Sequence, residues 1–266
     1  MKKHTQQLKL YDIRNSLLED FANHPENNAN GVDLIGKLLS FSERHAVSGN
    51  CWQYYVAYFI ANNVNAFSLS CERKPNFQGS LAEFAYEECR HLMDIFNYPL
   101  SSLPTVDNSA NLLKNFKSAT TESQLPYARI IADFTDKLKK CNTTKAFLEC
   151  VENFYCDYGV GELGLNKAFR VVDRDGSAKL VPISCMDKKR LDDLVGYQLQ
   201  KEKVLQNTNA FLEGKKANNV LLYGDMGTGK SSTIKALINE YYDKGLRVIE
   251  LYKHQFMHIS DLISKI

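Results

Sequence analysis

Apolar residues recur at helical spacing through the first part of the chain, from about Leu8 to Tyr158. A spacing of three and four residues places apolar side chains on one face of a helix, where they can pack against a core. Clear examples are Leu34, Leu38 and Leu39, and later Ile130, Ile131, Phe134 and Leu138. Stretches dense in Pro, Asn, Ser or Gly interrupt the pattern at 24–31, 72–79 and 99–110. This part is therefore predicted to be mostly α-helical.

Near residue 165 the period changes to that of β-strands. Short apolar runs at 168–173 and 179–183 flank 174–177, which contains an Asp-Gly pair typical of a tight turn. We expect a β-hairpin here, closing an N-terminal domain of residues 1–184. A calcium loop is disfavoured because its first ligand position would fall on Val171 and no glutamate stands six residues after Gly176.

After Cys185 the chain is polar and charged, and it then shows an amphipathic pattern that ends at Gly214. The elements expected next are a buried strand at 219–223, a glycine-rich turn at 224–229, a helix at 230–243 stopped by Gly245, and a strand at 246–251. The order strand, loop, helix, strand predicts an α/β domain over residues 185–266. The domain boundary is expected near Cys185.

Composition and charge narrow the class of protein only slightly. The chain has 266 residues, 44% of them hydrophobic and 24% charged, which is typical of globular proteins, and its net charge of +2 does not indicate nucleic acid. Seven cysteines form no C-x-x-C pair, and no apolar stretch follows the basic N-terminus, so reduced thiols in the cytoplasm are predicted. The most apolar window, 51–61, is shorter than the roughly 20 residues that span a bilayer and predicts a buried helix.

The segment that carries chemistry is the glycine-rich turn. Its residues, Gly224, Asp225, Met226, Gly227, Thr228, Gly229, Lys230 and Ser231, match G-x-x-x-x-G-K-[ST] at every fixed position. Glycines let the backbone curl around a polyphosphate, with N–H groups from about Gly227 to Ser232 pointing inward at the positive end of a helix dipole. A nucleoside triphosphate, ATP with Mg²⁺, is therefore the expected ligand.

Each polar residue at the helix start has an expected role. Lys230, to which we assign a catalytic role, would contact the β and γ phosphates, Ser231 would bind Mg²⁺, and Ser232 would reach the α phosphate. The competing interpretation is a glycine turn that only caps a helix. It is disfavoured because three glycines exceed what a cap needs, and because a lysine at a helix N-terminus opposes the dipole unless an anion is bound. Only the absence of an N-K-x-D sequence argues against a guanine base.

The residues around the loop carry a resemblance to a known family. The string Asp192-Asp193-Leu194-Val195-Gly196-Tyr197, followed by a helix and then GDMGTGKSS between two predicted strands, resembles the AAA+ P-loop ATPases. By that resemblance, the loop is a Walker A motif, and Leu194, Val195 and Gly196 line an adenine pocket. The strings VGYQ, NTNAFLEG and NNVLLYGD look most similar to an uncharacterised bacterial branch of AAA family ATPases, whose members also carry a helical N-terminal region.

The chain also departs from the AAA+ pattern. No run of four hydrophobic residues ending in Asp-Glu follows the loop, so Walker B is missing, together with sensor 1, the arginine finger and the lid. ATP hydrolysis needs acidic residues that complete the Mg²⁺ site and orient the attacking water. Neither Glu250 nor Asp261 has the hydrophobic strand context of a Walker B pair. We therefore expect the N-terminal portion of a longer ATPase, with an incomplete core and unpaired strand edges.

Other candidate sites have plainer interpretations. His254 and His258 have the spacing of metal ligands but lack a third ligand, so surface or packing roles are expected. The aromatic residues at 52–59 lack interleaved basic residues and are expected in a core rather than stacked on bases. The G-x-G-x-x-G match at 159–164 follows a predicted helix, not a strand, and does not indicate a dinucleotide site.

Two functional hypotheses remain open on the sequence. The first is an AAA+ ATPase whose ATP cycle moves a protein partner recognised by the helical N-terminal domain, with homo-oligomerisation of the full-length form. The second is a nucleotide-binding regulator or scaffold that does not hydrolyse ATP. A nucleotide kinase is a weaker third hypothesis, since kinases usually carry the loop near the N-terminus. Neither a membrane nor a nucleic acid is indicated as a partner.

Overall fold

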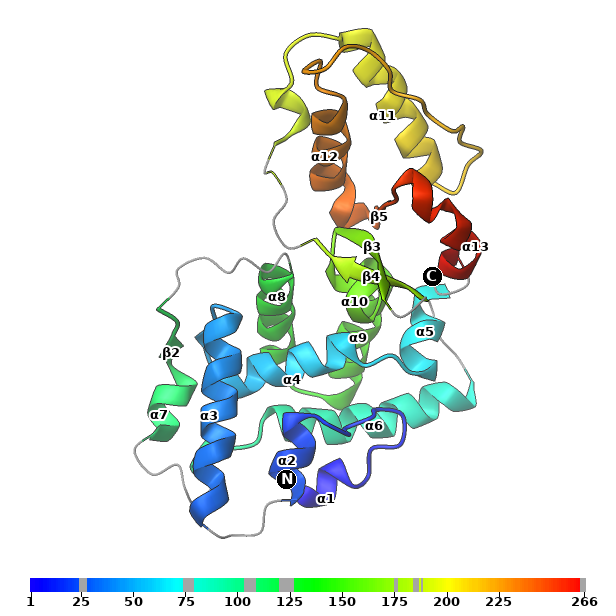
Figure 1. The fold of residues 1–266 in the computed structure, drawn as a ribbon. Helices are drawn as coiled ribbons and strands as arrows, with labels where there is room; N and C mark the ends of the chain where they lie inside the picture. Colours follow the sequence, from blue (N-terminus) through cyan, green and yellow to red (C-terminus); the bar gives the residue numbers. More distant parts are fainter. Residues whose placement is uncertain are drawn as a thin grey trace. The chain divides into compact units, whose positions relative to one another are not determined.

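A computed structural model of the chain describes residues 1–23, 28–73, 79–102, 109–119, 127–174, 177–183, 187 and 189–263. These residues form two compact units, Met1–Leu165 and Asn166–Ile266 (Figure 1). No helix in the described ranges has the length and apolar character needed to cross a bilayer. The six cysteines within the described ranges are free thiols. The expected boundary near Cys185 lies outside them.

The first unit is helical, as the spacing of apolar residues predicts. Its helices are α1 (Lys2–Thr5), α2 (Leu17–Asn23), α3 (Asn28–Arg44), α4 (Cys51–Asn62), α5 (Ala66–Arg73), α6 (Ser80–Phe96), η1 (Leu100–Ser102), α7 (Ser109–Lys114), α8 (Ala128–Lys139), α9 (Thr144–Tyr158) and α10 (Gly161–Leu165). Two short strands, β1 (Ser48–Gly49) and β2 (Phe116–Lys117), pair antiparallel. The expected break at 24–31 is shorter than predicted because α3 already begins at Asn28.

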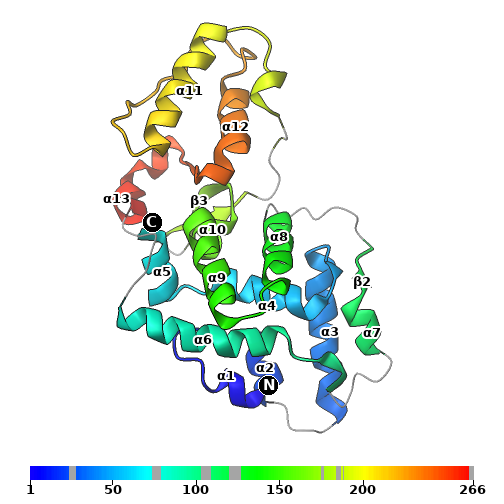
Figure 2. The same ribbon diagram turned by 180° about the vertical axis from the view of Figure 1, so that it is seen from behind.

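Helix α4 is the centre of this unit, with α3, α6, α8 and α9 packed around it (Figure 2). Its start is fixed by Asn50, whose side chain accepts hydrogen bonds from the backbone N–H groups of Trp52 and Gln53. Trp52 is fully buried, and its indole Nε1 donates to the carbonyl of Ile95 at 2.7 Å. The aromatic run that starts at Trp52 therefore serves the core, as predicted.

The second unit combines a small sheet with helices. Its elements are β3 (Ala168–Arg174), β4 (Ser177–Pro182), η2 (Leu191–Asp193), α11 (Gln198–Leu212), α12 (Lys230–Tyr241), η3 (Tyr242–Lys244), β5 (Val248–Glu250), η4 (Lys253–His258) and α13 (Ile259–Ile263). The strand order is β4-β3-β5. The predicted hairpin is present, with Phe169 opposite Pro182 and Arg174 opposite Ser177. Its turn residues, 175 and 176, lie outside the described residues.

The sequence led us to expect that the hairpin closes the helical unit, but it does not. It belongs to the second unit because β3 pairs in parallel with β5, with Ala168 opposite Val248. The side chains of Arg170 and Glu250 form a cross-strand ion pair at 2.8 Å. A small core of Val171, Ala178 and Leu262 packs against one side of this sheet. The boundary between the units thus lies between residues 165 and 166 of the chain, whereas the predicted domain boundary lies between 184 and 185.

The expected buried strand at 219–223 is not formed. These residues belong to neither of the two described sheets, and Leu221 and Tyr223 are 82% and 87% exposed. A strand requires a hydrogen-bonded neighbour, and among the described residues β5 pairs with β3 instead. The helix and strand predicted after the loop are present as α12 and β5, and Gly245 stops the helical segment with a φ of 91°.

Candidate functional site

The glycine-rich loop lies directly before α12 and leads into its first turn. Gly224, Gly227 and Gly229 have φ values of 138°, 88° and 85°. Side chains with a Cβ rarely adopt such positive values, so the loop needs glycine at these positions. Gly229 is the N-cap of α12 and provides no side-chain hydrogen bond to the helix. The backbone of the loop is therefore shaped by its glycines, as the motif predicts.

The first turn of α12 leaves several N–H groups before the first hydrogen bond within the helix. That bond runs from the Thr233 N–H to the Gly229 carbonyl at 2.8 Å, so the N–H groups of Lys230, Ser231 and Ser232 precede it. They lie at the positive end of the helix dipole. The arrangement offers several donors to an anion, and the exposed Ser231 hydroxyl lies in the same turn.

The Lys230 side chain folds back over the loop. Its Nζ donates to the carbonyls of Gly224 at 2.9 Å and Asp225 at 2.7 Å, and lies 3.3 Å from the Thr228 hydroxyl. The Thr228 hydroxyl donates to the same Asp225 carbonyl at 2.8 Å. The ammonium group is thus held at the mouth of the loop by neutral acceptors. A phosphate oxygen is a stronger acceptor for an ammonium than a carbonyl is.

The remaining residues of the motif face solvent. Asp225 is exposed, and Met226 is 100% exposed. Both side chains are exposed to solvent, so these two positions contribute to the loop through their backbone. This agrees with their place at the variable positions of the motif.

The segment entering the loop is held by α11. The Asn207 side chain accepts from the Asn218 N–H and donates to the Asn218 carbonyl, both at 2.8 Å. The sequence gives no local sign of this reciprocal pair, because it joins α11 to a segment 11 positions further along the chain. A cavity of about 440 Å³ lies beside this segment, lined by residues that include Phe211, Val220 and Ile234.

Residues 194–196, expected to line an adenine pocket, follow η2. Val195 is 94% exposed, and the Leu194 carbonyl accepts from the Lys201 ammonium at 2.6 Å. The segment before η2 is attached to α12 through the Asn239 side chain, which donates to the carbonyls of Asp187 and Lys189. Leu191 of η2 packs on the cluster of Val204, Leu237 and Tyr241 between α11 and α12. The role of 194–196 in binding adenine stays a prediction.

The other candidates have structural roles. His258 Nε2 lies 3.2 Å from an Asp173 carboxylate oxygen, and the ring of His254 stacks on Tyr252. Glu250 is paired with Arg170, as described above. The G-x-G-x-x-G stretch at 159–164 follows the end of α9 and runs into α10. A Cβ on Gly164 would lie 2.6 Å from the Gly159 carbonyl carbon. These glycines permit a close backbone contact.

Comparison with known proteins gives two similarities. Residues 165–266 match a family described as "Protein of unknown function (DUF815)", and this range begins one residue before the second compact unit. The chain is also 33% identical over 75 residues to the Replication factor C large subunit of Staphylothermus marinus. The matched residues make up 28% of this chain and 17% of that protein. No solved structure matches.

Proposed function

We propose that the chain binds ATP with Mg²⁺ at the loop from Gly224 to Ser232, as part of an AAA+ type ATPase. The observation that carries this proposal is the start of α12, which has no side-chain cap and where the Lys230 ammonium folds back over the loop. A polyphosphate entering the loop would replace the carbonyls as the partner of Lys230. The N–H groups of the first turn would then donate to phosphate oxygens. Ser231 would provide its hydroxyl to Mg²⁺ and Ser232 would reach the α phosphate.

The Replication factor C similarity supports the AAA+ part of this proposal but extends over a small part of that protein. We place ATP hydrolysis in this ATPase, with Leu194, Val195 and Gly196 against the adenine ring. The helical unit would recognise a protein partner, and the protein would form a homo-oligomer. We assign partner recognition to the unit Met1–Leu165 and nucleotide binding to the unit Asn166–Ile266.

A second function, nucleotide binding without turnover, is favoured by one observation. Glu250 is the acidic residue of the three-stranded sheet nearest in sequence after the loop, and its carboxylate is engaged by the Arg170 guanidinium at 2.8 Å. A carboxylate neutralised in this way is poorly placed to complete a Mg²⁺ site or to orient water. In this case the chain would act as a regulator or scaffold whose state depends on ATP.

Equilibrium binding of ATP, with and without Mg²⁺, tests the first proposal. Lys230→Ala removes the ammonium that would donate to phosphate, and charged hydrogen bonds of this kind contribute about 1.5–3 kcal/mol. We therefore expect ATP binding to weaken by roughly tenfold to a hundredfold. Lys235→Ala is the matched control because Lys235 lies exposed on the same helix. Equal binding by both variants would contradict the proposal.

Phosphate release in the same samples separates the two functions. Binding without release favours the regulator. Release that Lys230→Ala abolishes and Lys235→Ala keeps would show that the chain itself hydrolyses ATP.

A further inference from the structure

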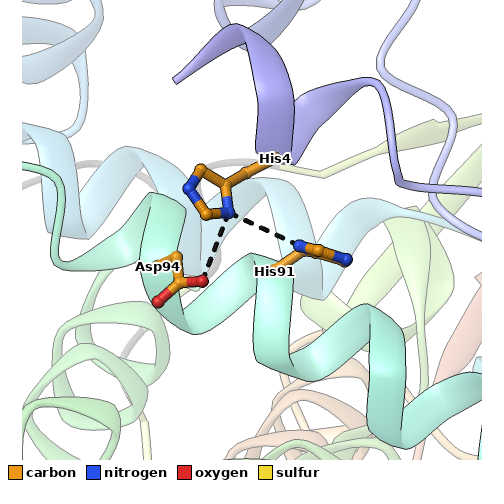
Figure 3. A group of neighbouring side chains, drawn as sticks. All are labelled: His4, His91 and Asp94. Atoms are coloured by element: carbon orange, nitrogen blue, oxygen red, sulfur yellow. Dashed lines mark hydrogen bonds and ion pairs between the residues drawn. The ribbon is translucent and has the colours of Figure 1, made fainter.

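Two histidines and an aspartate meet in the helical unit, where the N-terminal helix α1 contacts α6 (Figure 3). His4 comes from α1, and His91 and Asp94 come from α6. His4 Nδ1 lies 3.4 Å from His91 Nδ1 and 3.2 Å from Asp94 Oδ2. Their three ligand atoms all lie within 4.8 Å of one another. The sequence gives no local sign of this cluster because His4 and His91 are 87 positions apart.

A single proton does not satisfy these three atoms. A neutral imidazole carries one proton on its two nitrogens. If the His4 Nδ1 hydrogen is donated to Asp94, the lone pair of His91 Nδ1 can accept only from that same hydrogen, which would then be shared between two acceptors. If His91 Nδ1 donates to His4 instead, the His4 lone pair faces the Asp94 carboxylate. A cation between the three atoms would accept electron pairs from all of them at once.

Two of the three separations match those of ligands on one small cation. Zinc binds histidine nitrogen at about 2.0–2.1 Å and carboxylate oxygen at about 2.0–2.2 Å, usually as a tetrahedron. The edges of such a tetrahedron are about 3.3–3.5 Å long, from these bond lengths. The two measured separations, 3.4 Å and 3.2 Å, are close to this range. Two imidazoles and one carboxylate are also a ligand set that suits zinc.

We propose that His4, His91 and Asp94 bind a Zn²⁺ ion that fastens the N-terminal segment to α6. The side chains of His4 and Asp94 are 33% and 42% exposed, so water can reach the remaining coordination position. This site is independent of the proposed nucleotide loop, which lies in the other compact unit.

The N-terminal segment is already attached to α6 at a point close to the proposed zinc site. Three residues earlier on α6, the buried Glu88 carboxylate accepts hydrogen bonds from the backbone N–H groups of Lys9 and Leu10, at 2.5 Å and 3.1 Å. Residues three positions apart share a helix face, so Glu88, His91 and Asp94 present one face of α6 to the N-terminal segment. Zinc would add a second attachment to the one that Glu88 provides.

One neighbour opposes the ion. Arg90 Nη2 lies 3.4 Å from His91 Nε2, and this nitrogen must carry the hydrogen when Nδ1 binds a metal. Two donors would then face each other, so the guanidinium has to turn away toward Glu87, with which it already forms an ion pair at 2.6 Å. Arg90→Gln should therefore bind zinc several-fold more tightly than the unchanged chain.

The test is a Zn²⁺ titration of the full chain in competition with a chromophoric chelator, combined with X-ray absorption at the zinc edge. Thiols are the main competitors, since Cys141, Cys150 and Cys156 are free cysteines that are not fully buried. The absorption spectrum separates nitrogen and oxygen ligands from sulfur. The variants are His4→Gln and Asp94→Asn, and the control is His254→Gln, which removes a histidine of the other unit. His4 lies near the chain end and is partly exposed, and buried Trp52 reports by fluorescence that each variant remains folded.

We expect one equivalent of zinc with a sulfur-free shell in the unchanged chain and in His254→Gln. Binding should be at least tenfold weaker in His4→Gln and in Asp94→Asn. A shell that contains sulfur, unchanged affinity in both ligand variants, or no binding at micromolar zinc would each overturn the proposal.

Discussion

At the scale of single residues, Gly159 and Gly164 approach each other closely where α9 ends and α10 begins. A Cβ on Gly164 would lie 2.6 Å from the Gly159 carbonyl carbon and 2.9 Å from the Tyr158 carbonyl oxygen. Backbone atoms cannot move aside as a flexible side chain can. We expect Gly164→Ala to lower the free energy of unfolding by about 1–3 kcal/mol, the usual cost of overpacking.

The control for this substitution is Gly36→Ala. Gly36 lies within α3, and a Cβ there would meet nothing within 4 Å. Replacing an exposed helical glycine by alanine should stabilise the chain by about 0.5–1 kcal/mol. Urea unfolding followed by the fluorescence of Trp52, the single tryptophan, measures both changes. Equal effects of the two substitutions would contradict the close contact.

The buried Glu88 carboxyl group predicts how the free energy of unfolding depends on pH. Burial raises the pKa of its carboxyl above the ordinary 4.5, and the hydrogen bonds from Lys9, Leu10 and Tyr11 only partly oppose this. The folded chain therefore holds this proton to a higher pH than the unfolded chain does. The stability that this proton contributes is complete below about pH 4.5 and is lost as pH rises through the raised pKa.

Glu88→Gln should remove this part of the pH dependence. The comparison is the free energy of unfolding of both proteins at several pH values from 4 upward, with Glu87→Gln as a control because Glu87 lies exposed on the same helix. The stability of the unchanged chain should fall relative to Glu88→Gln as pH rises. A difference between them that stays constant with pH would contradict the assignment.

At the scale of elements, the attachment of the loop's entry segment to α11 is open to test. Asn207 makes two hydrogen bonds to the backbone of Asn218, and exposed hydrogen bonds contribute about 1 kcal/mol each. Asn207→Ala should therefore speed hydrogen exchange of the Asn218 amide by roughly tenfold or more. Asn209→Ala, on the same helix, is the control. Unchanged exchange in Asn207→Ala would show that the segment is held elsewhere.

The elements also show where sequence reasoning succeeds. Helix α12 and the stop at Gly245 were predicted because apolar spacing, a glycine N-cap and a glycine in the left-handed region are local signals. Helix α4 was predicted as buried for the same reason. The residues at 219–223 were predicted as a strand from an equally local signal, the apolar run, and this failed. Whether an apolar run becomes a strand depends on a neighbour that local sequence does not specify.

At the scale of the whole molecule, the division into a helical part and an α/β part was predicted, but the place of the hairpin was not. Its two strands carry clear local patterns, whereas the pairing of Arg170 with Glu250 joins residues 80 positions apart. The same limit applies to the His4, His91 and Asp94 cluster. The loop, by contrast, is contiguous in sequence, so its residues and its place before a helix could be read directly.

The proposed function requires a polyphosphate to bind at the start of α12. Backbone amide NMR of the full chain, titrated with Mg²⁺ and ATP, tests this binding because each N–H of the loop is observed separately. We predict that the largest shifts fall on residues 227–232 and that Lys230→Ala abolishes them at the same ATP concentration. Shifts centred on other residues, or none at millimolar ATP, would contradict the claim.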